Sequence, residues 1–483
     1  MSVYDQYETV IGLEIHVQLA TQSKAFCGDD ARFGAAPNTH VSAISLGHPG
    51  TLPRLNKRQV EYAVQLGLAL GCEIQRHNTF DRKNYFYADL PKGYQITQDR
   101  RPICVGGALQ IPSAEGEKSI RIHHIHMEED AGKSIHDQDP QHSLVDLNRA
   151  GVPLLEIVTE PDLRSPEEVD ALMTAMRQLV RYLEISDGNM EEGSLRCDCN
   201  VSVRLRGSDQ LGERCEVKNL NSMRFARRAI AYERRRQIDL IEAGGKVEQQ
   251  TLNFDPVSGM TSPLRDKEDA HDYRYFPEPD LPPVQLDEAY VDQLRATLPP
   301  LPWALRTELA TDYQLSPYNA ELLTQEKATA LYFKRLAAET PHFKAAANLL
   351  INKMLPWVQE RKTPLADFPL TTDQLAELIQ LIADDRVSNA VAYQRLFPAL
   401  LDRPEARPLA LAEALDLIQS QDDDFMATLV REVIEQHPDK VAAYRQGKKN
   451  LLGFFMGQVM RQSKGRANPK TAEALLQRTL AAD

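Results

Sequence analysis

The chain has 483 residues, 42% of them hydrophobic and 26% charged, with a formal net charge of −13. This length exceeds what one hydrophobic core usually organises, so two to four domains are expected. No apolar run approaches the roughly 20 residues of a membrane helix, and the first residues lack the basic and apolar regions of a signal peptide. We therefore expect a cytoplasmic protein.

The first predicted element is a strand over residues 10–19. Ile11 and Leu13 belong to an apolar face, while Glu14 and His16 lie opposite, because successive side chains of a strand point to opposite sides. Taken alone, this pattern indicates a half-buried strand with its polar face in water.

Residues 123–133 are the densest in ionisable groups, with three imidazoles, three carboxylates and one amine. Strict alternation predicts one face with Ile120, Ile122, His124, His126 and Glu128 and a second face with Arg121, His123, Ile125, Met127 and Glu129. So many ionisable groups are costly on a strand unless a cation or a charged ligand satisfies them. Carboxylate-rich sites suit Mg²⁺, which in turn suits phosphate chemistry.

Three further strand-like segments carry polar groups in alternation. Residues 154–158 include Glu156, residues 196–204 alternate apolar and polar side chains, and a third segment contains Glu216 and Lys218. We expect a curved, largely antiparallel sheet whose charged concave face collects these groups.

Two helices are predicted to interrupt this sheet. Ser165 followed by Pro166 and two glutamates is a strong helix start. The second helix begins near Asn221 and carries six arginines. These arginines either contact phosphates or form an ordinary exposed face, since acids lie nearby.

Prolines mark the domain boundaries. Seven of them fall between residues 277 and 302, and helix-forming residues dominate beyond this point. A second proline-containing segment lies at residues 403–408. We predict an α+β fold with a sheet domain over residues 1–293, an all-helical domain over 294–405 and a small helical tail bundle over 406–483.

The end of the chain is basic. Residues 445–483 carry a local charge of +6, which leaves −19 for the rest. This asymmetry indicates either a polyanion contact, such as an RNA backbone recognised by shape, or a solvated helical surface. The candidate nucleic-acid-binding residues are Lys448, Lys449, Arg461, Lys464 and Arg466. Gly453 and Gly457 would allow close helix packing or the approach of a ligand to the backbone.

Familiar nucleotide and hydrolase motifs are absent from the sequence. Gly132-Lys133-Ser134 resembles the end of a P-loop, but Met127 occupies a position where that motif requires glycine. A nucleotide would therefore be held by metal and basic side chains. The sequence also lacks the G-x-S-x-G and H-E-x-x-H motifs. The candidate metal ligands are Glu14, His16, Glu128, Glu129 and Glu156.

Several motifs together resemble the GatB family, one of the subunits of the bacterial aspartyl/glutamyl-tRNA(Asn/Gln) amidotransferases. The matching runs are Glu8-Thr9-Val10-Ile11-Gly12-Leu13-Glu14-Ile15-His16-Val17, Asp81-Arg82-Lys83-Asn84-Tyr85-Phe86-Tyr87, His126-Met127-Glu128-Glu129-Asp130-Ala131-Gly132-Lys133-Ser134, Leu144-Val145-Asp146-Leu147-Asn148-Arg149, Met190-Glu191-Glu192-Gly193-Ser194-Leu195-Arg196-Cys197-Asp198, Asp272-Tyr273-Arg274-Tyr275-Phe276-Pro277-Glu278-Pro279-Asp280 and Leu452-Gly453-Phe454-Phe455-Met456-Gly457. They span nearly the whole chain.

The resemblance implies a glutamine-synthetase-like cradle that binds ATP and Mg²⁺ and phosphorylates the side-chain carboxylate of Glu or Asp on misacylated tRNA(Gln) or tRNA(Asn). Ammonia from a partner, the amidase subunit, would displace the phosphate, and a further small subunit would brace a heterotrimer. On this basis the expected catalytic residues are Lys83, Glu128, Glu192 and Arg196. The expected nucleotide-binding residues are Lys83, Lys92, Arg196, Glu216, Lys218 and Arg274.

The sequence departs from this family at a zinc site. Some members bind zinc through a C-x-C and a later C-x-x-C motif, and the matching positions here are Cys27, Asp29, Ser42 and Ser45. One sulfur of four remains, so we predict no zinc.

Two other functions are compatible with parts of the pattern. A ligase of glutamine synthetase type that acts on a free amino acid would share the acidic cradle, but it leaves the basic tail unexplained. A non-catalytic RNA-binding scaffold would use the tail, but it leaves the acidic strand faces unexplained, because carboxylates repel phosphate.

Overall fold

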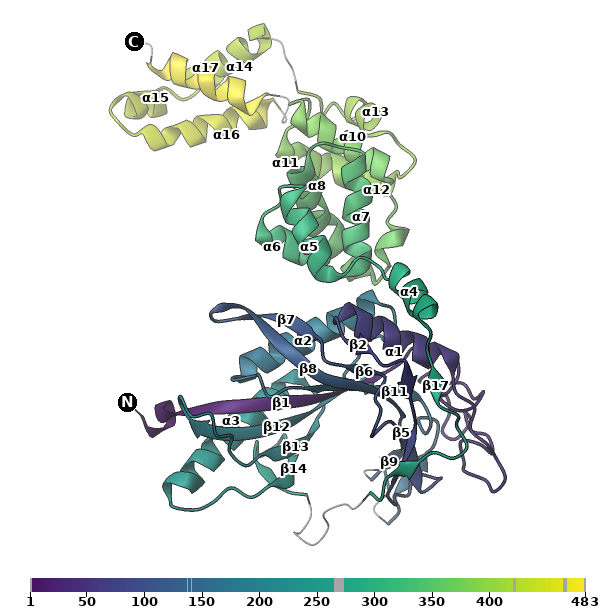
Figure 1. Cartoon of the computed structure of the whole chain (residues 1–483). Helices are drawn as coiled ribbons and strands as arrows, with labels where there is room; N and C mark the ends of the chain where they lie inside the picture. The colour runs from purple at the N-terminus through teal and green to yellow at the C-terminus, as the bar shows by residue number, and fades with distance from the viewer. Residues whose placement is uncertain are drawn as a thin grey trace. The chain divides into compact units, whose positions relative to one another are not determined.

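The computed structural model describes residues 2–136, 138–139, 141–264, 273–419, 423–463 and 467–481 (Figure 1). The chain divides into two compact units, Met1–Pro302 and Trp303–Asp483. The first unit combines sheets and helices, and the elements described in the second unit are helices. The predicted α+β fold class is confirmed.

A ten-stranded sheet organises the first unit. Its order is β15-β14-β13-β12-β1-β11-β8-β6-β2, with β7 also paired to β8. The strands are β1 (Tyr7–Gln18), β2 (Glu73–Ile74), β6 (Cys104–Val105), β7 (Ala108–Ser113), β8 (Gly116–Glu129), β11 (Pro153–Thr159), β12 (Leu195–Leu205), β13 (Cys215–Leu220), β14 (Gln250–Phe254) and β15 (Thr261–Pro263). Among these pairs β13 and β14 run parallel and the others antiparallel.

Three helices bury the apolar face of this sheet: α1 (Lys57–Ala69), α2 (Pro166–Tyr182) and α3 (Met223–Glu242). Ile11, Leu13 and Ile15 of β1 are buried in the same core. Helix α2 begins as predicted, because the Ser165 side chain accepts a hydrogen bond from the backbone N–H of Glu168. With the helices on one face, the polar side chains of the strands are left on the other.

The predicted faces of β8 are wrong in one respect. Ile120 and Ile122 lie in the core together with Ile125 and Met127, rather than with the histidines. The cause is a β-bulge: Val158 pairs with His124 and Thr159 pairs with Ile122, so one residue of β8 is extra. The bulge shifts the alternation by one residue.

Smaller elements complete the first unit. They are β3 (His77–Asn78), β4 (Asp81–Asn84), β5 (Tyr94–Thr97), β9 (Lys133–Ile135), β10 (Leu144–Asp146), β16 (Phe276–Pro277), β17 (Val284–Gln285) and α4 (Glu288–Ala296). β4 lies between β16 and β5 in a separate three-stranded sheet. A side-chain hydrogen bond from Gln95 to the backbone carbonyl of Glu129 (2.7 Å) ties β5 to the end of β8.

The second unit contains two apolar cores. The longer helices are α5 (Pro302–Thr311), α6 (Pro317–Thr324), α7 (Lys327–Ala338), α8 (Phe343–Leu349), α9 (Leu355–Arg361), α10 (Thr372–Ala383), α12 (Phe397–Asp402), α13 (Pro408–Ala414), α14 (Asp423–Glu435), α15 (Pro438–Arg445), α16 (Leu452–Gln462) and α17 (Pro469–Ala481). One core runs from Leu309 to Leu417 and the other from Met426 to Leu480. Helix α4, which crosses the predicted boundary at residue 293, packs Val291 and Leu294 into the core of the first unit. No helix in the described part of the chain has both the length and the apolarity that spanning a membrane requires.

Candidate active site

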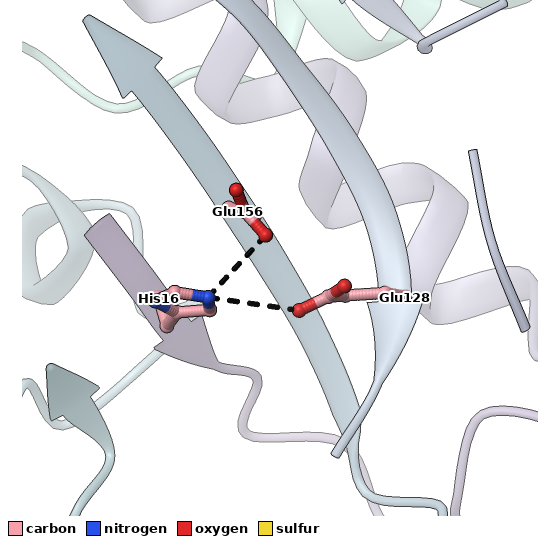
Figure 2. Close-up of side chains that lie close together, drawn as sticks. All are labelled: His16, Glu128 and Glu156. Carbon is pink, nitrogen blue, oxygen red and sulfur yellow. Dashed lines mark ion pairs between the residues drawn. The ribbon is translucent and has the colours of Figure 1, made fainter. Parts of the chain in front are cut away.

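An imidazole and two carboxylates meet on the polar face of the large sheet. His16 comes from β1, Glu128 from β8 and Glu156 from β11 (Figure 2). Nε2 of His16 lies 3.3 Å from Oε2 of Glu156 and 3.9 Å from Oε1 of Glu128. The strand register produces this meeting, because Glu156 pairs with His16 on one side and with His126 on the other. Nε2 of His126 lies 3.4 Å from Oε2 of Glu156.

We call His16, Glu128 and Glu156 the His16 group. In this group and in the neighbouring His126, burial and the surrounding charges shift the pKa values in opposite directions. Burial alone would lower the pKa of His126, but Glu156 and Glu128 outweigh it and raise the pKa to about 10. The same balance raises the pKa of His16. Burial alone would raise the pKa of Glu156, but the two imidazoles lower it well below its ordinary value. The carboxylate of Glu156 is therefore an anion at neutral pH.

A second group, which we call the Glu14 group, consists of Glu14, Asp198 and Glu216. Their carboxylate oxygens lie within 4.8 Å of one another. Nζ of Lys218 lies 2.9 Å from Oδ2 of Asp198 and 2.6 Å from Oε1 of Glu216. Burial, reinforced by Glu156 and Glu216, raises the pKa of Glu14. A cation placed among these oxygens would relieve that repulsion.

The two groups are neighbours on one face, because Glu14 and His16 are two residues apart on β1. The Glu14 group offers only oxygen ligands, and the His16 group offers oxygens and one imidazole nitrogen. Mg²⁺ prefers carboxylate oxygens and usually completes its coordination with water and phosphate. These residues therefore fit magnesium at one or both positions.

Lys83 faces the same carboxylates from β4. Its Nζ lies 4.8 Å from the centre of the Tyr273 ring. Burial alone would lower the pKa of Lys83, but the negative charge of Glu128, with smaller contributions from Tyr275 and Glu156, raises it. The ammonium group is thus held in its charged form next to the acids.

Arg196 lies beside the His16 group and is fixed by a carboxylate. It pairs with His16 across β1 and β12, and its NH2 lies 3.1 Å from both oxygens of Asp130. Nε2 of Gln18 donates to Oδ2 of the same Asp130 at 2.6 Å. Among the described residues the buried Nε of Arg196 has no hydrogen-bond partner, so this side chain keeps an unused donor.

Four other predicted site residues lie outside both groups. Glu129 turns to the opposite side of β8 from Glu128, forms an ion pair with Lys92 and accepts a hydrogen bond from the backbone N–H of Ile96 (3.0 Å). Glu192 is exposed in the turn before β12, and Arg274 is exposed in a left-handed backbone conformation with φ of 43°. These four residues thus belong to neither carboxylate group. The predicted residues that do lie in the two groups or contact them are Glu14, His16, Glu128, Glu156, Glu216 and Lys218.

Three residues that lie at the site were not predicted from the sequence. Asp198 completes the Glu14 group, His126 joins the His16 group, and Asp130 fixes Arg196. Asp198 stands two residues after Arg196 on the predicted polar face of its strand, so the alternation alone contains the signal that identifies it. His126 stands two residues before Glu128 on the same predicted face, so the alternation contains a signal for it as well. Asp130 belongs to the charged segment but has no spacing signal of its own.

The positions that match the zinc motif lie together but offer a different set of donors. Ser45 Oγ donates to Oδ2 of Asp29 (2.6 Å), and the backbone N–H of Ser42 donates to Ser45 Oγ (2.9 Å). Burial raises the pKa of the neighbouring Cys27 thiol to about 11. One protonated thiol, one carboxylate and two hydroxyls do not fit the thiolate and imidazole ligands of structural zinc sites.

The arginines of α3 mostly bind within the protein. Arg227 pairs with Glu167, Arg228 and Arg234 donate to the carbonyls of Pro256 and Tyr4, and Arg236 pairs with Glu233. Of the two interpretations that the sequence left open, the structure favours the one without phosphate contacts for these four residues.

The basic residues of the tail lie near the two ends of α16. Lys448, Lys449 and Arg461 are exposed, and Nζ of Lys449 lies 4.2 Å from the centre of the Tyr444 ring. Lys464 and Arg466 lie outside the described residues. The predicted nucleic-acid contacts of all five residues stay predictions.

Gly453 and Gly457 form an open strip on α16. Both are exposed, and a Cβ atom added at either position would meet nothing within 4 Å. The strip therefore does not serve helix packing within the described part of this bundle. It leaves helix backbone accessible to a large ligand.

Two family models and several curated relatives match the chain. The GatB/GatE catalytic domain matches residues 9–292, and the GatB domain matches residues 331–480. The B subunit of an aspartyl/glutamyl-tRNA(Asn/Gln) amidotransferase from Salinibacter ruber is 48% identical, covering 99% of this chain and 97% of its own length. Proteins of the same name from Prosthecochloris aestuarii and an Anaeromyxobacter species are 46% and 48% identical, each covering 98% of this chain and 98% and 99% of their own lengths.

Proposed function

This chain belongs to the GatB family of tRNA amidotransferase subunits, and from that premise we propose that its first unit catalyses ATP-dependent amidation of glutamate or aspartate carried by tRNA. The substrates would be Glu-tRNA(Gln), Asp-tRNA(Asn) or both, the two tRNAs in the names of the relatives. The reaction would take place where tRNA is aminoacylated, in the cytoplasm.

The proposed chemistry has two steps. A side-chain carboxylate is a poor acyl donor, so its oxygen first attacks the γ-phosphoryl group of ATP, which forms an acyl phosphate and releases ADP. Ammonia then attacks the acyl carbon, a C–N bond forms, and the C–O bond to phosphate breaks. The products are the amide, inorganic phosphate and a proton. Phosphoryl transfer of this kind depends on positioning and on stabilisation of negative charge.

The carboxylates of the two groups support this assignment most strongly. Without a cation they would repel a triphosphate, and the Glu14 group and the His16 group are the residues that would hold Mg²⁺. Bound Mg²⁺ neutralises phosphate oxygens. Lys83 would place its ammonium charge against the transferred phosphoryl group, and Arg196, oriented by Asp130, would contact a phosphate or carboxylate oxygen through its remaining donors.

Partner proteins and the second unit would complete the reaction. An amidase subunit would supply ammonia from glutamine, which agrees with the lack of nucleophile motifs in this sequence, and a further small subunit would brace a heterotrimer. The exposed cations near α16 would hold the tRNA backbone, and the glycine strip would let that backbone come close to the helix.

The decisive experiment measures ATP binding and tRNA amidation in the reconstituted complex. Full-length protein should bind ATP only with Mg²⁺, and Asp198→Asn should weaken this binding by about tenfold or more, because it removes a charge from the Glu14 group. Asp170→Asn, a change of the same kind on helix α2, is the matched control. Equal amidation of free glutamate would instead identify a small-molecule ligase, and ATP binding that ignores Mg²⁺ would contradict the proposed site.

A further inference from the structure

The bulge in β8 places two neighbouring imidazoles on the same side of the strand. The ladder pairs His124 with Val158 and Ile122 with Thr159, so His123 is the extra residue. The flanking Ile122 and Ile125 are buried in the core, while His123 is exposed and His124 is half-buried. Two consecutive side chains of a regular strand would point to opposite faces, so the bulge creates this pair.

The two rings face each other through the nitrogens nearest the backbone. Nδ1 of His123 lies 2.7 Å from Nδ1 of His124, with the ring planes at 76°. Nε2 of His124 lies 3.1 Å from Nδ1 of His126, whose ring stacks on it. His124 is therefore held in place from its far side, while His123 is free to adjust at the surface.

We propose that His123 and His124 form a binding site for a late first-row transition-metal cation, with Cu²⁺ or Ni²⁺ preferred over Zn²⁺. Imidazole nitrogens are the ligands these ions favour, and the order of affinities peaks at Cu²⁺. Water would occupy the remaining coordination positions, since the pair does not belong to any group of three or more ligating side chains in the described part of the chain.

The spacing of the two nitrogens supports this preference. At metal–nitrogen distances of about 2.0–2.1 Å, nitrogens about 2.7 Å apart subtend an angle of about 80°. That angle is close to the right angle between neighbouring ligands of square-planar or octahedral ions and well below the tetrahedral angle that zinc adopts. A small rotation of the exposed His123 ring would aim both Nδ1 atoms at one ion, once the proton that lies between them has been displaced.

The pair is chemically distinct from the carboxylates of the proposed active site. Burial, with the nearby His126 and His123, lowers the pKa of His124 to about 4, so this ring is neutral at physiological pH. Protonated His126 donates from Nδ1 to Nε2 of His124, so the ring proton of His124 sits on Nδ1. Metal binding would shift that proton to Nε2 and release one proton from His126. His126 points its Nε2 at Glu156 instead (3.4 Å). Mg²⁺ prefers the oxygen-rich groups, whereas a borderline-soft ion prefers the imidazole pair.

The test is a Cu²⁺ titration of the full-length protein without a histidine tag, in millimolar Mg²⁺ to occupy the carboxylate groups. Electron paramagnetic resonance should show one tightly bound Cu²⁺ with two equatorial nitrogens. His123→Ala should weaken this binding at least tenfold and remove one nitrogen from the spectrum. The matched control is His142→Ala, which removes another exposed histidine, one that pairs with Asp139, and should leave the Cu²⁺ affinity unchanged.

Two results would overturn the proposal. One is an unchanged Cu²⁺ affinity in His123→Ala; the other is loss of the bound ion in His16→Gln but not in His123→Ala, which would place the copper in the His16 group. Because His123 is exposed and outside that group, its variant should keep the unfolding temperature and the Mg²⁺-dependent ATP binding of the wild type. A failure of the proposed amidation would leave the copper result untouched.

Discussion

The two units of the chain differ in where they keep their charged side chains. The first unit buries several, and Glu128, Glu129 and Asp130 are only 2%, 3% and 4% exposed. Among the described residues of Trp303–Asp483, the buried polar side chains are all uncharged. Buried charge destabilises a fold unless it is paired, so its concentration in one unit indicates where chemistry takes place. The second unit, with an apolar interior and exposed cations, is suited to binding.

Replacing Lys83 should have the largest effect, because it removes a half-buried ammonium charge that lies beside the carboxylates of the first unit. We expect Lys83→Ala to lower the rate of ATP-dependent tRNA amidation by roughly 100-fold or more, the usual cost of removing one group that stabilises transition-state charge. The measurement is single-turnover formation of amidated tRNA by the reconstituted complex.

Lys118→Ala is the matched control for Lys83. Lys118 also pairs with a carboxylate, Glu168 at 2.8 Å, but outside both carboxylate groups, so its loss should change the rate by less than about twofold. Equal effects of the two variants, or a wild-type rate for Lys83→Ala, would show that buried charge does not identify the catalytic side chains here.

The fold was more predictable than the details of the site because hydrophobic alternation is a local signal. The apolar faces of β1 and β12 and the start of α2 follow directly from residue spacing. The face of β8 did not, because a strict period of two was carried across a bulge at His123 that depends on pairing with β11. Its local sign is the shift of the apolar positions from Ile120 and Ile122 to Ile125 and Met127. One extra residue therefore reversed the predicted orientation of Ile125.

The site was harder to predict than the fold, because it depends on which strands lie next to one another in the sheet. The candidates from β1, β8, β11 and β13 meet because the sheet places these strands close together, and their spacing within each strand already assigned most of them to the polar face. Glu129 fails to join them because it follows Glu128 directly and so turns away. Lys92 balances Glu129, a pairing of two distant segments that single-strand spacing cannot reveal.

Measuring the free energy of unfolding as a function of pH would test how much the buried charges of the first unit, here His126, contribute to stability. Its pKa is raised from 6.5 to about 10 in the folded protein, so protonated His126 stabilises the fold fully below pH 6.5 and this contribution is lost as the pH rises towards 10. In the absence of divalent cations, the free energy of unfolding of the wild type should fall by a few kcal/mol as the pH rises from 6.5 towards 10. This size follows from the pKa shift of His126. Chemical denaturation at each pH measures it.

His126→Gln should flatten that pH dependence, since it removes the titrating group. His437, which lies before helix α15 in the second unit, provides the control: His437→Gln should keep the wild-type slope. Parallel curves for His126→Gln and the wild type would show that the pairing with Glu156 and Glu128 does not persist in solution.

Reversing the charge of basic side chains in the second unit should weaken tRNA binding without changing the rate of the chemical step. We expect the double variant Lys448→Glu and Lys449→Glu to raise the KM for tRNA by about tenfold at physiological salt and to leave kcat unchanged. Each lost phosphate contact should also lower the slope of log KM against log salt by about one. Lys344→Glu, the same change elsewhere in the unit, is the control. A fall in kcat at constant KM would contradict the division of roles.

The smallest expected effect separates stability from binding within α16. Glycine inside a helix is less stable than alanine by roughly 0.5–1 kcal/mol, and a Cβ at Gly457 meets nothing within 4 Å, so Gly457→Ala should raise the free energy of unfolding by about that amount. If tRNA backbone approaches this strip, Gly457→Leu should weaken tRNA binding while the fold stays intact. Gly447→Ala should instead destabilise the protein, because Gly447 has a φ of +106°. Unchanged tRNA affinity in Gly457→Leu would exclude the strip from the binding surface.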